Sequence, residues 1–419
     1  MAGKGQGLSP PTIVSALPAT SRTKGFRQWP ASPGSQTIRS DVSDKVMPIS
    51  RRHFLGLGLS APFLLTSPGT AIGADPPKKR IFIVCSYARD YIWSRSTQRG
   101  VNEAMLKYGY LDNEAQGLQL MDLDWVESSR ALVKKAWMDT KRRNSRTDIA
   151  VSTERIMAEL RQFAPDLVLL GDDNAANFIG NQLLGSSIPV VFWGINGLPL
   201  KYGLIENLDA PGRNITGVWQ SGYYKESLEL LKRLVPTANT FAILACDSET
   251  SRPSVKMIEL LARRDALPIK LVDSIVTNDY EEYRARALEI AGRVDAFFVL
   301  NHDTLRDRQR QHVDMLEVGR WYLEHIPIPE ASNEDQFVHE GMLLTANDSG
   351  YNQGYAAFEM AQLILDKGVS PARMAVRTPD RGPYLVNRNR AQQLNIDLED
   401  SMYLIDEIVT ESLALGITG

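Results

Sequence analysis

Apolar runs alternate with amphipathic stretches along the chain from residue 78 onward. Short runs without polar interruptions are typical of strands that are buried on both faces of a sheet. These predicted strands occupy residues 80–85, 166–170, 188–193, 240–246, 269–276 and 296–300, with a further Ile-Pro strand at 326–329. The amphipathic stretches predict helices at residues 100–108, 154–163, 175–184, 257–263, 279–291 and 313–324. Strands that alternate with helices indicate parallel sheets with right-handed crossovers.

One stretch of the chain occurs twice. Residues 212–236 read as a short strand, a Ser-Gly break and an amphipathic helix, and residues 342–365 repeat that order. The tripeptide Ser-Gly-Tyr stands at 221–223 and again at 349–351, 128 residues later. Each half also opens with an apolar strand that ends in Cys. We therefore predict an α/β fold of two similar, Rossmann-like lobes with parallel sheets, which face each other across a cleft and are joined by hinge crossings.

The repeat also predicts where the lobes begin and end. The first lobe is expected to contain residues 75–218 plus about 346–369. The second is expected to contain residues 219–345 plus about 370–400, followed by a C-terminal tail at 401–419.

The N-terminal region differs from the rest of the chain. Residues 1–46 are rich in Gly, Pro, Ser and Thr and have no apolar period, so we expect disorder there, in an extension that precedes a true start at Met47. Ser50–Leu55 (SRRHFL) is similar to the twin-arginine export motif, and the apolar run that follows is too short to span a bilayer. Residues 47–74 are thus predicted to be a twin-arginine signal peptide that is cleaved after Gly73 or Ala74. The alternative is an Arg pair that precedes a buried helix.

The charge balance limits the partners. Residues 75–419 carry 39 Lys and Arg against 48 Asp and Glu. An acidic body argues against nucleic acid as a partner, because phosphate binding requires a basic face. The short basic run Lys141–Arg143 is expected to be a solvated surface.

The reactive residue types do not form a catalytic pattern. Cys85 and Cys246 end equivalent strands of opposite halves, and a disulfide between them would oppose hinge motion, so we expect two buried thiols. The histidines of the later chain lack the spacing of metal ligands. The sequence contains neither a Walker A loop nor a G-x-S-x-G nucleophile elbow. We therefore predict no cofactor, no metal site and no catalytic residue.

Ligands of α/β sheets bind beyond the carboxyl ends of the strands. Polar and aromatic residues at those ends, and at the first crossing, are therefore the candidate ligand-binding residues. They are Ser86, Tyr87, Tyr91, Trp93, Asp172, Asp173, Asn174, Trp193 and Asn196 in the first half, Trp219, Gln220 and Tyr223 at the crossing, and Asp247, Asn301, His302 and Asn333 in the second half.

Each candidate also has a purely structural interpretation. A residue of the Asp172–Asn174 run could cap the following helix while its neighbour meets a cationic group. Aromatic residues more often fill a core than line a ligand site. The aromatic residues at the predicted cleft nevertheless favour a flat or aromatic ligand, or a cation held against ring faces.

Several segments, taken in order and spacing, resemble a known family. They are Trp137–Arg142, Gly171–Ala175, Ile188–Asn196, Gly212–Gly217, Ala357–Met360, Val386–Asn387 and Ala391–Ile396, which together cover about residues 80–400. The chain resembles the ABC-transporter substrate-binding proteins of the type I periplasmic-binding fold. Within these it resembles the subgroup related to tryptophan-type binding proteins and to sensor domains on some bacterial histidine kinases.

The resemblance implies a periplasmic solute-binding protein, monomeric and not embedded in the membrane in its mature form. Such a protein closes its lobes on a small polar or aromatic organic ligand and delivers it to an ABC permease. A module that reports the ligand to a sensor kinase is the alternative. A periplasmic α/β enzyme is a third reading, and the lack of a nucleophile–base pair or metal arrangement stands against it.

Overall fold

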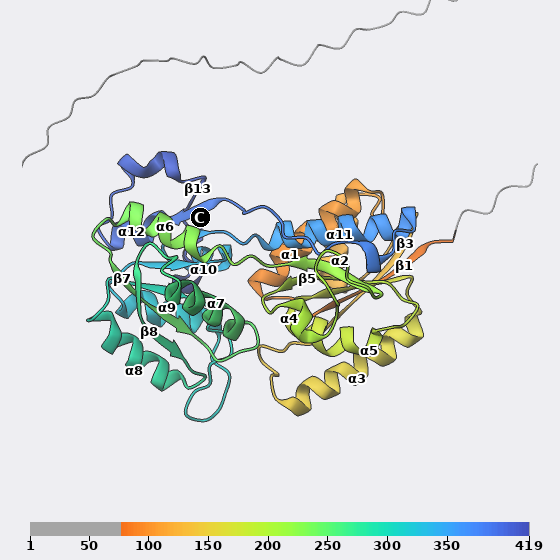
Figure 1. The fold of residues 1–419 in the computed structure, drawn as a ribbon, viewed down its shortest axis with the longest axis horizontal. Coiled ribbons are helices and arrows are strands. Elements are labelled where there is room, and N and C mark those ends of the chain that lie inside the picture. Colours follow the sequence, from red (N-terminus) through yellow and green to blue (C-terminus); the bar gives the residue numbers. More distant parts are fainter. Residues whose placement is uncertain (1–76, 419) are drawn as a thin grey trace, which may run out of the picture. The chain divides into compact units, whose positions relative to one another are not determined.

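The computed structural model describes residues 77–418, which all belong to one compact unit, Gly73–Gly419. The predicted extension and signal peptide lie outside the described residues. Within the unit the chain forms two α/β lobes, each built on a sheet of its own (Figure 1). The predicted α/β class with two lobes is confirmed.

The first lobe is built on a six-stranded sheet with the order β2-β3-β1-β4-β5-β6. All neighbouring strands are parallel except β2 and β3. The strands are β1 (Lys79–Cys85), β2 (Trp125–Glu127), β3 (Ala131–Trp137), β4 (Leu167–Gly171), β5 (Val190–Ile195) and β6 (Ile215–Trp219).

Helices cover both faces of this sheet, which explains why its central strands are apolar at every position. Ile81 and Ile83 of β1 pack with α1 and α11 on one face, and Phe82 and Val84 pack with α3 on the other. The helices of this lobe are α1 (Ile92–Lys107), α2 (Glu114–Leu123), α3 (Arg146–Phe163), α4 (Asp172–Asn174), the π-helical turn η1 (Ala175–Gly180), α5 (Asn181–Leu183), the 3-10 turns η2 (Pro199–Tyr202) and η3 (Pro371–Arg373), and α11 (Gly350–Lys367).

The second lobe is built on a seven-stranded sheet with the order β13-β12-β11-β10-β9-β7-β8. Only the pair β11 and β12 is antiparallel. The strands are β7 (Thr240–Ala245), β8 (Lys270–Val276), β9 (Ala296–Val299), β10 (Glu330–Ser332), β11 (Leu344–Ala346), β12 (Tyr384–Asn387) and β13 (Glu407–Val409).

This sheet is also covered on both faces. Leu244 of β7 packs with α8 and α9, and its neighbours Ile243 and Ala245 pack with α6 and α7. The helices are α6 (Tyr224–Leu234), α7 (Ser251–Arg263), α8 (Tyr280–Ala291), α9 (Met315–His325), α10 (Asp335–Glu340), α12 (Arg388–Gln393) and the 3-10 turns η4 (Glu399–Leu404) and η5 (Leu413–Leu415).

The chain crosses between the lobes three times: between β6 and α6, between β11 and α11, and before β12. The three crossings are hydrogen-bonded to one another. The Gly222 amide donates to Asp348 Oδ2 at 2.6 Å, the Tyr223 hydroxyl donates to the Pro379 carbonyl at 2.8 Å, and the Gly382 amide donates to the Asn347 carbonyl at 2.8 Å. Both Ser-Gly-Tyr copies lie at these crossings, so the sequence repeat marks the hinge region.

The structure places some segments differently from the sequence prediction. Residues 371–377 contact the first lobe, where the Thr216 hydroxyl donates to the Met374 carbonyl at 2.6 Å. Residues 407–409 form the edge strand β13 of the second sheet. The predicted strand 326–329 was wrong: β10 begins at Glu330, because Pro327 and Pro329 have no amide N–H to donate to a neighbouring strand. The predicted helix 175–184 is a π-helical turn between two short helices.

Candidate functional site

The lobes meet through loops that follow the carboxyl ends of their parallel strands. Tyr87 and Tyr91 follow β1, and Lys141 follows β3. Across from them, Thr250 follows β7 and Asp303 follows β9. We call these five residues the interlobe cluster.

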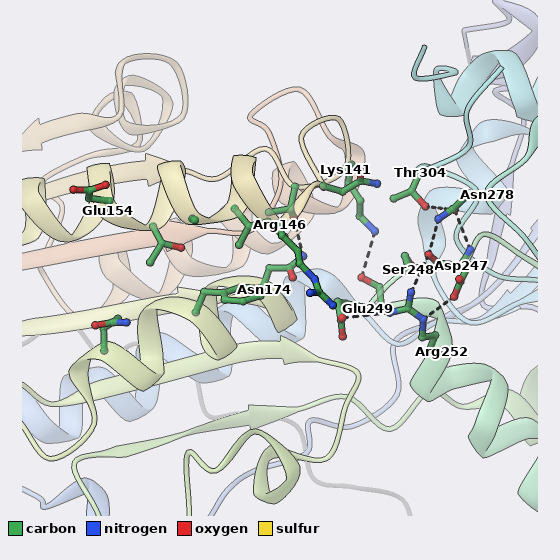
Figure 2. Close-up of a pocket in the computed structure, with 18 of the residues that line it drawn as sticks. Lys141, Arg146, Glu154, Asn174, Asp247, Ser248, Glu249, Arg252, Asn278 and Thr304 are labelled. Carbon is green, nitrogen blue, oxygen red and sulfur yellow. Dashed lines mark hydrogen bonds and ion pairs between the residues drawn. The ribbon is translucent and has the colours of Figure 1, made fainter. Parts of the chain in front are cut away.

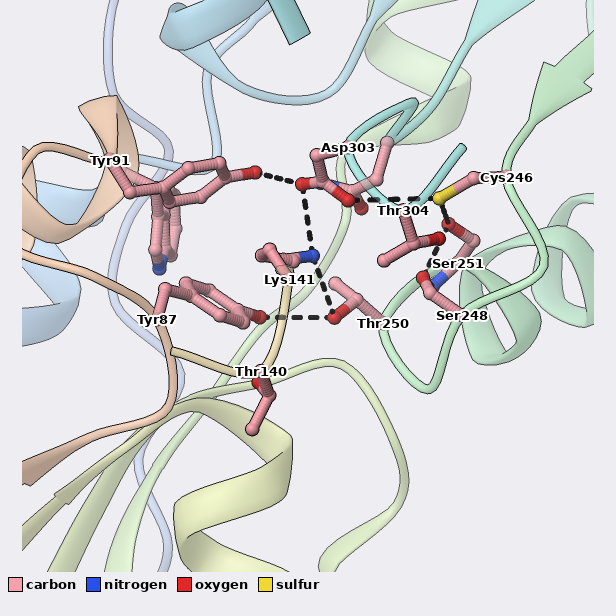
Figure 3. Close-up of polar contacts among 12 residues, drawn as sticks. Tyr87, Tyr91, Thr140, Lys141, Cys246, Ser248, Thr250, Ser251, Asp303 and Thr304 are labelled. Carbon is pink, nitrogen blue, oxygen red and sulfur yellow. Dashed lines mark hydrogen bonds and ion pairs between the residues drawn. The ribbon is translucent and has the colours of Figure 1, made fainter. Parts of the chain in front are cut away.

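The centre of the interlobe cluster is a buried ion pair (Figure 3). Lys141 Nζ lies 3.0 Å from Asp303 Oδ2 and donates to Thr250 Oγ1 at 3.3 Å. The Tyr91 hydroxyl donates to the same Asp303 carboxylate, and the Tyr87 hydroxyl shares a 3.0 Å hydrogen bond with Thr250 Oγ1. The ammonium also lies 4.4 Å from the centre of the Tyr87 ring. The ion pair and the hydrogen bonds join one lobe to the other, whereas the contact with the Tyr87 ring lies within the first lobe.

Burial and pairing act in opposite directions on this pair. Burial alone would lower the pKa of Lys141, but the Asp303 carboxylate outweighs it and raises that pKa. Burial would raise the pKa of Asp303, but Lys141 and the Tyr91 hydroxyl hold it below the usual range. Both groups are therefore charged at neutral pH.

Beside the interlobe cluster the lobes leave a narrow gap, the interlobe void, which in this closed arrangement has no room for a water molecule. It is smaller than the ~300–1,000 Å³ of typical ligand pockets. Five of its lining residues were predicted candidates and two, Thr250 and Glu334, were not. The lining residues are Tyr87, Tyr91, Trp93, Asn196, Thr250, Asn301 and Glu334.

Two other candidates of the first lobe, Ser86 and Asp173, hold the loops around this void. The Ser86 hydroxyl donates to the Gly171 carbonyl at 2.6 Å and accepts from the Ala175 amide at 2.8 Å. Asp173 accepts from the Gly197 amide at 3.0 Å and from the Tyr202 hydroxyl at 2.8 Å. These bonds fix the loops after β4 and β5.

Asp172 and Asn174 lie on either side of Asp173 and have fewer partners. Asp172 has a left-handed backbone conformation, φ +68°, which is strained for a residue with a side chain. Its Oδ1 accepts from Trp93 Nε1 at 2.7 Å. Asn174 Nδ2 donates to Thr140 Oγ1 at 2.8 Å, and Asn174 Oδ1 has no partner among the described residues.

The remaining aromatic candidates lie in or near the core. Trp193 is buried against Gly171, whose missing Cβ would lie 2.5 Å from the indole. Trp219 is half-buried and packs with the core on the α3 side of the first sheet. Neither indole N–H has a partner in the part of the chain that the structure describes.

The remaining polar candidates fall into two groups. Near the void, Gln220 Nε2 and Asn333 Nδ2 lie 3.4 and 3.5 Å from Glu334 Oε1. Away from it, Tyr223 reaches the third crossing, and His302 points into the second lobe, where its Nε2 lies 2.8 Å from Glu340 Oε2. Whether any candidate touches ligand stays a prediction.

A groove of about 1010 Å³ opens at the edge of the interlobe contact (Figure 2). Its walls carry Asn174 and Arg146 on the first lobe, and Asp247, Glu249 and Arg252 on the second. Asp247 is paired with Arg252, at 2.6 Å between Oδ1 and Nε. Thr250 lines both the groove and the void.

The expectation that Lys141 is solvated was wrong, although Arg142 and Arg143 are exposed. Lys141 is 5 % exposed because the tyrosine rings of one lobe and Asp303 of the other enclose it. Its sequence neighbours are basic, so nothing local distinguishes it. Asp303 and Glu334 were missed although each directly follows a predicted candidate, His302 and Asn333.

Both cysteines are free and buried, as expected. Within residues 77–418, no group of three or more His, Cys, Asp and Glu side chains is arranged to hold a metal ion. None of the helices described combines the length and the apolar character that crossing a bilayer requires.

Comparison with known sequences places the chain among transport proteins. A family model described as ABC transporter substrate binding protein matches residues 133–407. A tyrosine-binding protein of Clostridioides difficile (strain R20291) is 23% identical over 210 residues, which is 50% of this chain and 57% of that protein. The matched region thus spans less than two thirds of that relative.

Solved structures share the fold. The ABC domain in complex with L-Trp from Streptococcus pneumoniae has a TM-score of 0.61 and 18% identity, covering 80% of this chain and 100% of that one. The ligand-free, open structure of a substrate binding protein with adhesive properties from Clostridium difficile has a TM-score of 0.57 and 22% identity, covering 80% and 99%.

Proposed function

Because the chain belongs to the family of ABC transporter substrate binding proteins, we propose that it captures a small organic ligand between its two lobes and delivers it to an ABC permease. The observation that carries this proposal is the interlobe void, which is lined by strand-end residues of both lobes. A ligand held by both lobes stabilises the closed form, which is the signal that a permease reads.

The ligand that we propose is an aromatic amino acid. Three aromatic side chains, Tyr87, Tyr91 and Trp93, line one side of the void, and flat rings favour aromatic partners. One relative is a tyrosine-binding protein and one structural neighbour holds L-Trp. The void is smaller than a typical ligand pocket, so the lobes must part at the groove before such a ligand can enter.

We further propose that the protein is exported to the periplasm by the twin-arginine route and works there as a monomer. Ser50–Leu55 supports the route. The two lobes of one chain supply both walls of the proposed site, as a monomer requires.

A thermal-shift screen of the purified protein tests ligand capture. L-Trp, L-Tyr and L-Phe are compared with sugars, nucleobases and aliphatic amino acids. A ligand at a hundred times its Kd should stabilise the folded form by about 2.7 kcal/mol. Asn301→Ala removes a polar group from the void and should weaken binding, whereas Asn207→Ala in an exposed loop of the first lobe is the matched control.

The outcomes separate the parts of the proposal. Unchanged binding by Asn301→Ala would place the ligand outside the void. A shift with sugars or nucleobases alone would keep capture and reject the aromatic amino acid. Delivery to a permease is tested by deleting the gene. The deletion should abolish uptake of the identified ligand by the cell, and expression of the parent chain should restore it.

A further inference from the structure

The interlobe void contains a carboxylate that has no cationic partner. Glu334 lies just beyond β10 and is 4 % exposed. Its Oε2 accepts from Gln336 Nε2 at 2.9 Å, and Oε1 has only two long contacts, 3.4 Å from Gln220 and 3.5 Å from Asn333. Within residues 77–418, its carboxylate forms no ion pair with Lys, Arg or His.

An isolated carboxylate is costly to bury, because water no longer stabilises its charge. Burial, with the nearby Asp348 carboxylate, raises the pKa of Glu334 well above its usual value. Lys141 is the nearby cation, but its ammonium is already paired with Asp303. Glu334 therefore has no cation of its own in the closed cleft, and a ligand cation placed beside it would favour the charged carboxylate.

The wall of the void that belongs to the first lobe is suited to a cation. The rings of Tyr87 and Tyr91 lie edge to face, with centres 5.0 Å apart, and Trp93 lines the same space. The Lys141 ammonium already lies near the faces of both tyrosines, 4.4 and 5.6 Å from their centres. Ring faces of this kind attract ammonium groups.

The remaining lining residues supply hydrogen-bond acceptors. Thr250 carries a hydroxyl oxygen, and Asn196 and Asn301 carry amide oxygens. A primary ammonium has three donors that must all find acceptors when it is buried. A quaternary ammonium has no donors and could not form hydrogen bonds with these oxygens.

We propose that Glu334 is the residue that selects the ligand, by binding its primary ammonium group inside the void against the rings of Tyr87, Tyr91 and Trp93. This inference rests on the proposed capture of an aromatic amino acid and names the group by which that amino acid is recognised. It predicts that aromatic carboxylates without an amino group bind poorly.

Isothermal titration with matched ligands tests the inference. L-Tyr and L-Trp are each compared with the same molecule lacking the amino group, 3-(4-hydroxyphenyl)propionate and indole-3-propionate. With the parent protein, loss of the ammonium should weaken binding by about 10- to 100-fold, the range expected for a buried charged hydrogen bond. With Glu334→Gln, the amino acids should lose a similar factor, and the two ligand types should bind about equally.

Glu324→Gln in α9 is the matched control, because it makes the same chemical change on an exposed side chain of the same lobe that lines neither the void nor the groove. It should preserve the preference for the amino acid. The inference is overturned if the parent binds both ligand types equally, a comparison that does not depend on any variant folding. It is also overturned if Glu334→Gln keeps the full preference. In both cases the protein still binds aromatic ligands, so capture stands. If the parent binds neither ligand type, the aromatic ligand class fails, and this inference fails with it.

Discussion

At the scale of single residues, several buried carboxylates gather where the two lobes meet, together with the buried ammonium of Lys141. Five carboxylates with at most 4 % exposure lie where the lobes meet, and each is stabilised by different neighbours. They are Asp172 with the Trp93 indole, Asp173 with loop amides, Asp303 with Lys141, Asp348 with the Gly222 amide, and Glu334 with side-chain amides. Their titration should affect stability.

Asp348 offers a measurable case. Burial raises its pKa to about 6, against the hydrogen bonds from Gly222 and Gln353, whereas an unfolded chain has an Asp pKa of about 3.9. Between about pH 4 and 6 the folded form thus binds more protons than the unfolded form, so stability falls as pH rises through this window. The total fall is about 3 kcal/mol.

The side chain of Asp348→Asn cannot titrate, so the stability of this variant should not decrease between about pH 4 and 6 as that of the parent does. The unfolding free energy of the variant minus that of the parent, from urea denaturation, should therefore rise by about 3 kcal/mol between about pH 4 and 7. Asp380→Asn, an exposed change near the third crossing, is the matched control. A difference for Asp348→Asn that does not vary with pH would contradict the burial argument.

Part of the candidate site could be predicted from the positions of residues at the ends of strands. It found five of the seven residues that line the void, because any loop beyond β1, β5 or β9 reaches the same edge of its sheet. It could not separate neighbours such as His302 and Asp303, since one side chain turns into the lobe and the other turns out of it. The sequence pattern does not contain that choice of direction.

At the scale of elements, α1 and α11 pack closely although they lie far apart in the chain. Glycines on both helices allow this. A Cβ at Gly100 would lie 2.0 Å from the Tyr351 carbonyl oxygen, and a Cβ at Gly354 would lie 2.1 Å from the Thr97 carbonyl oxygen. Any side chain at either position must push the helices apart.

Gly354→Ala should therefore destabilise the protein, by about 1–3 kcal/mol or more from overpacking. Helix propensity alone predicts the opposite sign, a gain of roughly 0.5–1 kcal/mol. Gly117→Ala in α2 is the control, because its Cβ would meet nothing nearer than 3.5 Å. Urea unfolding midpoints show which effect is larger, overpacking or helix propensity. Equal midpoints for Gly354→Ala and Gly117→Ala would contradict the close packing of α1 and α11.

Element prediction succeeded where burial was simple. The continuous apolar runs of β1, β7 and β9 were found almost to the residue. In contrast β3 (ALVKKAW) was missed, because Lys134 and Lys135 interrupt its pattern. Lys135 is nevertheless buried, with its Nζ bonded to the Leu120 carbonyl at 3.1 Å and placed over the Trp137 ring. Such a compensated lysine cannot be recognised from sequence.

At the scale of the whole molecule, the interlobe cluster decides how firmly the ligand-free protein is closed. A buried ion pair contributes little net stability when it is formed, but removal of one partner leaves an uncompensated charge that costs about 3–5 kcal/mol. That cost falls on the closed form alone, because opening returns Asp303 to water.

Lys141→Met should therefore shift the ligand-free protein toward the open form, by a factor of more than about 100. Small-angle X-ray scattering without ligand should report a larger radius of gyration than that of the parent. Arg142→Met, the exposed neighbour whose ion pair with Asp90 lies on the surface, should change nothing measurable.

The variant that lacks both charges completes this test. Lys141→Met with Asp303→Asn removes the uncompensated carboxylate and should restore much of the closure. If the single variant scatters like the parent, the ion pair does not control the opening of the lobes.

The interleaving of the lobes also affects how the protein is made. The ribosome releases all strands of the first sheet by residue 219, but α11, which covers one of its faces, emerges only after residue 367. The second lobe in turn waits for β12 and β13, which end at residue 409. Neither lobe can therefore be finished before residues from the later part of the chain have been made. One face of the first sheet therefore stays uncovered while residues 220–367 are made, a period in which chaperones rather than native contacts must protect it.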